Sequence, residues 1–419
     1  MSEGDNVQAK RIVVIGAGIA GVSAALYLQR DGHQVTVLDP RDPGTAASFG
    51  NAGVIARYGC VPTATPDMLA RVPKLLMNPY GPLAIRWSYL PRLAPWLLQL
   101  IRNAAPQRIL ANARSKSALL DLAWDAYLVL IEEAGAGDLI HHGGMIRVYE
   151  TDEGFRRAQR EIDLMRQCGR KVDILTADEI RDLEPALAPI FRHGLYFSDS
   201  HNIRNPGRLV EMFSRRFTTG QGAVVKQAVT GLARNAEGDW RVATDGEGFE
   251  ADAIVVAAGA WSARIAKMIG VRVLLDTERG YHVMLPHPDE TLGRSVHFAE
   301  PTCMITPMEG GLRLTTGVEL AGVDAPPDYT RVRRMIPIAK RLIPGLKGEI
   351  QTEWMGWRPS MPDTVPVLGR APGHDNVYFA FGGAHIGMTL GPIMGRVVAD
   401  LVAGRDPGVD LAPYRADRM

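Results

Sequence analysis

The most informative residues of the sequence are three glycines and one aspartate near its N-terminus. The segment GAGIAG places glycines at positions 16, 18 and 21, after the apolar residues 11–15 and before a helical pattern at 20–30. Glycines at this spacing allow a tight turn and let the backbone approach a pyrophosphate, which the helix amides and dipole then hold. Asp39 ends a second apolar run, where its carboxylate can accept both hydroxyls of a ribose. The pattern predicts a dinucleotide site.

Both FAD and NAD bind to such a site, and two later segments favour FAD. Residues 253–261, AIVVAAGAW, indicate a buried strand that runs into Gly259, whose small neighbours let the backbone pass close to a diphosphate. Residues 381–392, FGGAHIGMTLGP, form a second glycine turn before a second helix. We expect Thr389 to cap that helix and Pro392 to lie in its first turn. Its amides would then face the pyrimidine edge of a flavin, where negative charge develops on reduction.

Composition excludes several other classes of protein. The 419 residues are 46% hydrophobic and 22% charged, with a net charge of +1, so nothing in the overall charge attracts nucleic acid. The three cysteines lack the spacing of a metal site or a disulfide framework, and we predict no bound metal. The N-terminus is polar and acidic rather than signal-like. We therefore expect a cytoplasmic protein.

Residues 83–101 combine large apolar side chains with arginines and tryptophans. The interpretation that we favour is a buried helix that covers the substrate site as a cap. Pro91 and Pro95 are expected to break this helix. The same pattern also fits an interfacial helix, which leaves open a location peripheral to the inner membrane.

The elements that position these residues predict an α/β fold of two domains. A strand, helix, strand unit occupies residues 11–38, long helical patterns fill 60–135, and alternating strand patterns return after 281. We expect a Rossmann-type FAD-binding domain, discontinuous in sequence, with an α+β substrate domain built on an antiparallel sheet. The FAD-binding domain is predicted at 8–58, 201–265 and 354–419, and the substrate or cap domain at 59–200 and 266–353.

Five segments spread over the chain also resemble one protein family. They are GAGIAG with Asp39, SFGNAG at 48–53, DAIVVAAGAWS at 252–262, GWRPSMPDTVPVLG at 356–369 and GGAHIGMTLGP at 382–392. In this order they resemble the FAD-dependent D-amino-acid oxidase superfamily, which includes glycine oxidase, sarcosine oxidase, D-amino-acid dehydrogenase and hydroxyproline dehydrogenase. The bacterial D-amino-acid dehydrogenase branch is the most similar.

The glycine turns and the resemblance together predict the residues that contact FAD. Val225 is implied beside the adenine, and the segment after Gly382 around the pyrimidine end. The predicted set is Gly16, Gly18, Ile19, Ala20, Gly21, Asp39, Pro40, Arg41, Ser48, Gly50, Asn51, Ala52, Gly53, Val225, Ala258, Gly259, Trp261, Gly356, Arg358, Gly383, Ile386, Gly387, Met388 and Thr389.

Three residues are predicted to act on the substrate. Arg358 matches the position at which the resembling oxidases bind the substrate carboxylate, and an arginine fork holds a carboxylate through two parallel hydrogen bonds. His385 lies in the glycine turn beside the expected flavin, and Tyr281 in a strand expected over its substrate face. The loop at 360–364 lacks the glycine that the family often has there, which leaves its local turn open.

The predicted reaction is the oxidative deamination of a small amino acid of D-amino-acid or D-hydroxyproline type. A hydride passes from the α-carbon to flavin N5, and the imino acid hydrolyses to a 2-oxo acid. A dehydrogenase is favoured over an oxidase, with oxygen or a quinone as the electron acceptor. A glycine or sarcosine-type amine oxidase, a 2-hydroxy-acid oxidoreductase and a non-catalytic FAD-holding subunit of a dehydrogenase complex remain alternatives. Homo- or hetero-oligomers also remain open.

Overall fold

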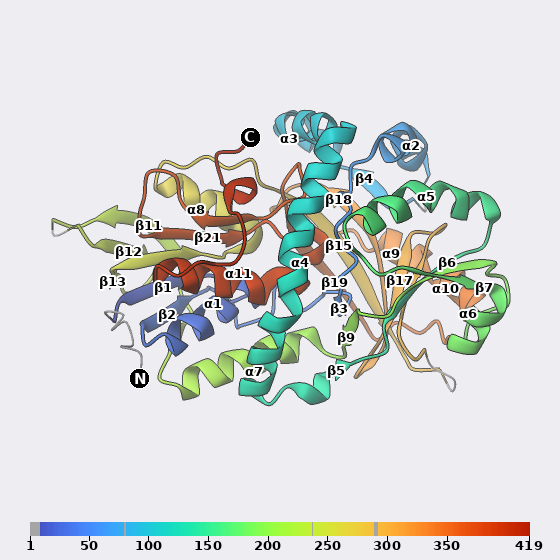
Figure 1. Cartoon of the computed structure of the whole chain (residues 1–419), viewed down its shortest axis with the longest axis horizontal. Coiled ribbons are helices and arrows are strands. Elements are labelled where there is room, and N and C mark those ends of the chain that lie inside the picture. Colours follow the sequence, from blue (N-terminus) through green and yellow to red (C-terminus); the bar gives the residue numbers. More distant parts are fainter. Residues whose placement is uncertain (1–8, 79–80, 237, 289–291) are drawn as a thin grey trace.

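The structure is a computed structural model that describes residues 9–78, 81–236, 238–288 and 292–419. Two large sheets lie side by side in it (Figure 1). The first has six strands in the order β10-β2-β1-β14-β21-β20, all parallel except β20. Their bounds are β1 (Arg11–Ile15), β2 (Gln34–Leu38), β10 (Ala223–Val225), β14 (Ala253–Val256), β20 (Val367–Arg370) and β21 (Val377–Phe381).

Both faces of this sheet are buried. Along β1, Ile12 and Val14 pack into one hydrophobic core and Val13 and Ile15 into another, because successive side chains of a strand point to opposite faces. Helices cover one face: α1 (Ile19–Arg30), α4 (Pro106–Ala134), α7 (Pro206–Thr219) and α11 (Gly387–Val402). The other face carries β11 (Val229–Arg234), β12 (Trp240–Thr244), β13 (Phe249–Ala251) and α8 (Ser262–Met268).

The second sheet follows the order β19-β15-β18-β17-β16-β6-β8-β7, and β4 pairs with β18. We expected an antiparallel sheet, but β16 runs parallel to β6 and β4 parallel to β18, so the sheet is mixed. Its strands are β4 (Leu83–Ile85), β6 (Met145–Tyr149), β7 (Asp173–Thr176), β8 (His193–Phe197), β15 (Asp276–Leu285), β16 (Ser295–Phe298), β17 (Cys303–Met308), β18 (Gly311–Leu320) and β19 (Thr352–Ser360).

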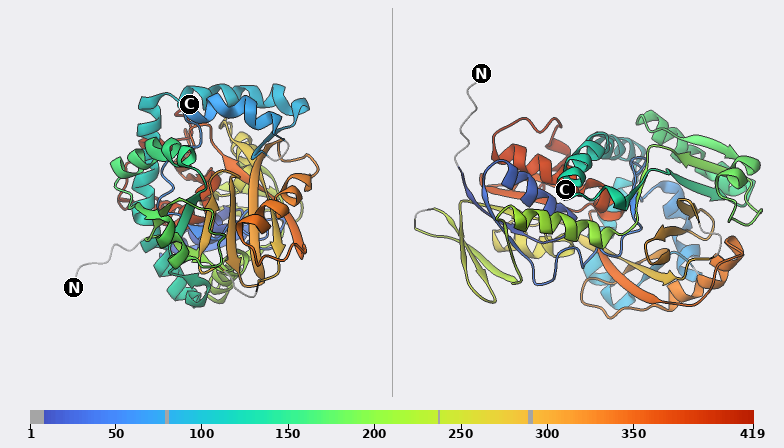
Figure 2. Two further views of the ribbon diagram at one scale, coloured as in Figure 1. Left: turned by 90° about the vertical axis from the view of Figure 1, so that its right-hand side faces the viewer. Right: turned by 90° about the horizontal axis from the view of Figure 1, so that it is seen from below.

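Shorter elements complete the fold. A small sheet of β3 (Val54–Ile55), β9 (His201–Ile203) and β5 (Ile140–His141) lies apart from the two large ones. The remaining helices are α2 (Pro66–Met77), α3 (Leu90–Asn103), α5 (Asp152–Gln167), α6 (Ala177–Leu183), α9 (Thr330–Arg334) and α10 (Ile336–Leu342). Helices α2 and α3 lie along one edge of the molecule, uppermost in Figure 1 and in the left view of Figure 2.

The predicted fold class is confirmed, whereas two elements cross the predicted domain boundaries. Most of strand β19, from residue 354 on, falls in the segment assigned to FAD binding, but the strand belongs to the nine-stranded sheet. Helix α4 falls in the segment assigned to the cap but packs in the same core as α1 and α11. Sequence order cannot reveal such crossings, because each depends on which surface a segment meets in three dimensions.

Two expectations about proline were wrong. Pro95 lies inside α3 without ending it, and Pro392 lies inside α11 rather than in its first turn. Helix α11 begins earlier, at Gly387, and Thr389 does not cap it. The hydroxyl of Thr389 instead accepts a hydrogen bond from the N–H of Ala56 at 2.9 Å. Among the described residues, no helix is both long and apolar enough to cross a bilayer.

Candidate active site

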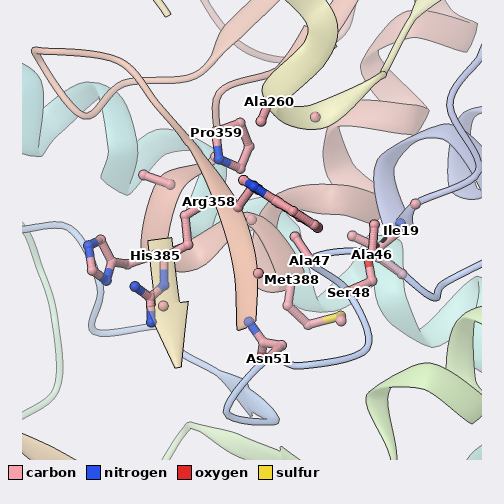
Figure 3. A pocket seen from close by; sticks show the side chains of 18 of the residues that line it. Ile19, Ala46, Ala47, Ser48, Asn51, Ala260, Arg358, Pro359, His385 and Met388 are labelled. Atoms are coloured by element: carbon pink, nitrogen blue, oxygen red, sulfur yellow. Dashed lines mark hydrogen bonds between the residues drawn. The ribbon is translucent and has the colours of Figure 1, made fainter. Parts of the chain in front are cut away.

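A cavity of about 730 Å³ draws its walls from both large sheets. The loops after β1, β2 and β14 line one part of it, and β15, β18 and β19 line another. Figure 3 shows Ile19 and Ser48 on one side and Arg358 and His385 on the opposite side, with Asn51 and Met388 between them. The two groups of predicted residues therefore share one cavity.

The glycine turn after β1 fits closely against neighbouring backbone. Gly16 has φ +114°, and a Cβ there would lie 2.4 Å from the carbonyl oxygen of Ala257. At Gly21 it would lie 1.9 Å from the oxygen of Gly16. Gly18 caps α1 without a side-chain bond of its own. The N–H of Ile19 donates to Oγ of Ser48 at 3.1 Å, and the amides of Ala20 and Gly21 remain available to an anion. This arrangement suits a pyrophosphate.

Asp39 lies beside this turn at the end of β2. Its Oδ2 accepts the N–H of Ala17 at 2.8 Å and its Oδ1 accepts that of Arg41 at 2.9 Å. Each carboxylate oxygen has a further lone pair, so both can still accept a ribose hydroxyl. The guanidinium of Arg41 lies over the rings of Trp261 and Trp357, at 4.4 and 5.2 Å from their centroids. The cavity thus has the donors and acceptors that an adenosine diphosphate group needs.

Most of the predicted cofactor residues line the cavity, and four do not: Gly21, Gly53, Val225 and Thr389. Gly21 packs on the glycine turn, and a Cβ at Gly53 would lie 2.5 Å from the oxygen of Ile203. The carbonyl of Val225 accepts the N–H of Asp39 at 3.2 Å. These residues support the wall of the cavity without lining it. Residues outside the predicted set also line the cavity: Ala46, Ala47, Gln227, Ala228, Ala260 and Trp354.

Paired residues of β15 and β19 give the cavity a flat wall. Across these strands Glu278 stands opposite Arg358, Gly280 opposite Gly356, and His282 opposite Trp354. A Cβ on Gly280 would lie 2.3 Å from the guanidinium carbon of Arg358. One on Gly356 would lie 1.8 Å from the ring of Trp354. The glycine pair therefore leaves a space that large flanking side chains border, and such a space suits a planar ring.

Arg358 presents an unpaired guanidinium to this space. Its Nη1 donates to the carbonyl of Gly317 at 3.1 Å. Within the described part of the chain, no carboxylate reaches this guanidinium at ion-pair distance. Burial lowers the pKa of Arg358, and the negative charge of Glu278 opposes that shift. A partly buried cation that has no carboxylate partner among the described residues favours an anionic ligand.

Glu278 and His385 form a close pair next to this arginine. Glu278 Oε2 and His385 Nε2 are 2.5 Å apart. Burial opposes the ionisation of Glu278, but His385 and Arg358 outweigh it and lower the pKa of Glu278. Glu278 is therefore a carboxylate that fixes the imidazole of His385 in place. No sequence motif marks Glu278, although it shares a strand face with Gly280 and His282 by the two-residue period of β-strands.

Tyr281 lines the cavity, but its hydroxyl is used elsewhere. It donates to Oε2 of Glu319 at 2.5 Å and accepts the N–H of Asp328 at 3.2 Å. With both bonds made to the protein, the hydroxyl of Tyr281 gives no support from geometry to the prediction that Tyr281 acts on the substrate. The side chain of Tyr281 points away from the face that Gly280 and His282 share, because successive side chains of a strand point to opposite faces.

The fold and the cavity define a class of protein with a dinucleotide-binding domain joined to a sheet that closes over it. A family model for FAD dependent oxidoreductases matches residues 11–401. A D-amino-acid oxidase from Bradyrhizobium diazoefficiens is 35% identical over 98% of this chain and 99% of its own length. The chain belongs to this family of FAD-dependent oxidoreductases, and FAD is its cofactor.

Solved structures agree on the fold. Glycine oxidase from Geobacillus kaustophilus has a TM-score of 0.75 at 24% identity, covering 98% of this chain and 100% of its own. Iminodiacetate oxidase from Chelativorans sp. BNC1 has a TM-score of 0.71 at 22% identity, covering 97% and 99%. The glycine turn, Asp39 and the Gly280–Gly356 space are places that the parts of FAD fit. The predicted family and cofactor are thus confirmed.

Proposed function

We propose that the chain oxidises a small amino acid of D-amino-acid or D-hydroxyproline type at its α-carbon. The observation that carries this proposal is the unpaired guanidinium of Arg358 beside the Gly280–Gly356 space. The curated relative of 35% identity, named a D-amino-acid oxidase, supports an amino-acid substrate.

In this proposal Arg358 binds the substrate carboxylate through both arms of its fork. Two parallel charge-assisted bonds fix the orientation of the α-carbon as well as its position. The carbonyl of Gly317 holds Nη1, so the fork is already directed before substrate arrives. Lysine would supply the charge without the planar geometry.

His385 is proposed to contact the substrate amine. Glu278 holds Nε2 of His385, which leaves the other ring nitrogen, Nδ1, for a ligand in the cavity. When bound, FAD supplies the two-electron acceptor for the hydride of the α-carbon. The amine must be neutral to release that hydride. The imine of a primary amino acid then hydrolyses in water to a 2-oxo acid and ammonia, whereas the cyclic imine of a hydroxyproline would open its ring and keep the nitrogen.

Whether electrons leave to oxygen or to a quinone stays a prediction, with a dehydrogenase favoured. The flavin of the holoenzyme is reduced anaerobically, and its reoxidation by oxygen is compared with that by a soluble quinone analogue. Rapid reoxidation by oxygen alone would contradict the dehydrogenase.

Anaerobic reduction by a panel of substrates tests the proposal. We expect D-amino acids or hydroxyprolines to bleach the flavin absorbance, with L-amino acids and 2-hydroxy acids far slower. The Arg358→Ala variant should retain FAD but lose about 10²–10³ in the second-order rate of reduction, as expected when a charged partner is removed. Arg358→Lys should recover only part of this loss.

The surface residue Arg370 offers a matched control, because among the described residues its hydrogen bonds go to backbone carbonyls and it lies over the ring of Tyr378 at 5.7 Å, away from the cavity. Arg370→Ala should reduce at the rate of the parent protein. A flavin that only hydroxy acids bleach, or equal rates in Arg358→Ala and the parent, would refute the proposed reaction.

A further inference from the structure

The edge formed by α2 and α3 has an outer surface that packs against nothing else in the described chain. Helix α2 buries none of its residues. Helix α3 buries Leu93 and Trp96 against Leu320 and leaves its opposite face exposed. Both helices lie at the periphery in Figure 1 and in the left view of Figure 2. We call this surface the α2–α3 edge.

Large apolar side chains are exposed along the α2–α3 edge. Met77 is 78% exposed, Trp87 67%, Leu98 51% and Ile101 56%. They fall within 25 residues of sequence, from 77 to 101, whereas soluble surfaces usually expose such side chains singly. An exposed tryptophan among aliphatic side chains is typical of a surface that enters a membrane interface.

The charge around these side chains has one sign. Residues 68–120 contain six arginines and two lysines and neither aspartate nor glutamate, in a chain whose net charge is +1. Five of these cations border the α2–α3 edge and are exposed, and in the described part of the chain none of the five has an ion-pair partner. They are Arg71, Lys74, Arg86, Arg92 and Arg102.

We propose that the α2–α3 edge docks on an anionic lipid bilayer. The apolar side chains enter the interface while the cations stay at the headgroups, where each strengthens binding about fivefold near an anionic surface. A second copy fits the surface less well, because a two-fold contact places the same patch against itself and brings cation against cation.

Docking in this way places the active-site cavity next to the membrane. Val61, Thr63 and Pro82, on either side of α2 in the sequence, line the cavity. The indole of Trp96 donates to the carbonyl of Ser360 at 3.0 Å, at the end of the strand that carries Arg358. The lipid-facing helices are therefore joined directly to the cavity wall.

Co-sedimentation of the FAD-loaded protein with vesicles tests the proposal. One vesicle contains phosphatidylcholine alone, and the other contains phosphatidylcholine with anionic phosphatidylglycerol. We expect binding to the anionic vesicles that weakens as salt is added, and much weaker binding to the neutral ones. Absence of binding to the anionic vesicles would overturn the proposal.

Two double variants and a control locate the surface. Trp87→Ser with Leu98→Gln, and Arg92→Gln with Arg102→Gln, should each weaken binding to anionic vesicles by on the order of tenfold or more. The control replaces Leu128 and Ile174 by Gln, because both are also exposed but lie away from the edge. FAD content checks that all variants fold.

Equal vesicle binding by the edge variants and the control would refute the docking surface. A protein that stays off the vesicles but becomes smaller in light scattering when Trp87 and Leu98 are replaced would identify a second copy as the partner instead. Either result overturns lipid docking.

Discussion

Gly280 and Gly356 face each other between two pairs of large side chains. Arg358 closes one end of the space and Trp354 the other, and a Cβ at either glycine would overlap with one of them. At the scale of single residues, the width of the cavity is therefore set by the absence of side chains at these two positions. An alanine there must displace a side chain that itself borders the cavity.

We predict that Gly356→Ala weakens FAD binding by about fivefold or more. The new methyl group would lie 1.8 Å from the ring of Trp354 and push it toward the space, and such overpacking costs about 1–3 kcal/mol. The dissociation constant of FAD for the apoprotein, measured by quenching of flavin fluorescence, checks this. Gly137→Ala is the control, since its Cβ would meet open space. Unchanged FAD affinity in Gly356→Ala would show that this space does not hold the flavin.

Single residues also show what the sequence could and could not predict. Gly16, Gly18 and Asp39 have a local pattern that states their geometry, and the structure places all three on the cavity. Glu278 has no such pattern. Its importance depends on Arg358 and His385, which reach it only when β15 and β19 pair and the glycine turn before α11 closes over them.

At the scale of elements, α11 and α4 are joined by a bond that a proline makes necessary. Pro392 has no N–H, so the carbonyl of Met388, four residues earlier in α11, lacks its helical partner. The hydroxyl of Tyr127, from α4, donates to that carbonyl at 2.5 Å. Burial raises the pKa of Tyr127, which keeps the hydroxyl protonated as a donor. The interhelical bond thus replaces a bond inside the helix.

Tyr127→Phe should destabilise the protein by about 1–3 kcal/mol, because the carbonyl of Met388 loses its partner in a buried place. Tyr27→Phe is the matched control: its hydroxyl donates at 2.8 Å to Ala126, whose carbonyl also has a helical partner available. We expect a smaller loss there. Urea unfolding measures both, and Pro392→Ala should reduce the effect of Tyr127→Phe by restoring the helical donor. Equal losses for both tyrosines would contradict this account.

Local elements were predicted well, and long-range arrangements less well. The two strands expected on either side of the first helix are present as β1 and β2. Strand β1 is recognisable because a parallel strand buried on both faces has a nearly continuous apolar run. The spacing of Thr176 and Glu179 in TADEIRDLEP predicts a capping box, which the structure contains at the start of α6. The start of α11 was misplaced because proline alone suggested a first turn, whereas a bond from a helix more than 250 residues away allows it inside.

At the scale of the whole molecule, three histidines from different parts of the fold share one electrostatic property. Burial lowers the pKa of His201 to about 4, and those of His282 and His297 to about 3, from the ordinary 6.5. His282 is therefore neutral, and its Nδ1 lies 3.2 Å from the carbonyl of Gly50, to which it donates. The folded chain keeps these rings unprotonated at pH values where the unfolded chain does not.

Stability should therefore fall as the pH drops below about 6.5, since unfolding then takes up protons that the folded state excludes. Each such histidine adds up to about 1.4 kcal/mol per pH unit. Glu184 and Asp276, whose pKa values burial raises, act in the opposite direction and reduce the total slope.

A single substitution isolates the contribution of one histidine from that of these groups. The free energy of unfolding in urea, followed from about pH 7 to pH 5, should decline less steeply in His297→Gln than in the parent protein. Replacement of the exposed residue Ile174 by Gln should leave the slope unchanged. Parallel curves for His297→Gln and the parent would mean that His297 is protonated equally in the folded and unfolded chains, and the neutral buried imidazole would have to be abandoned.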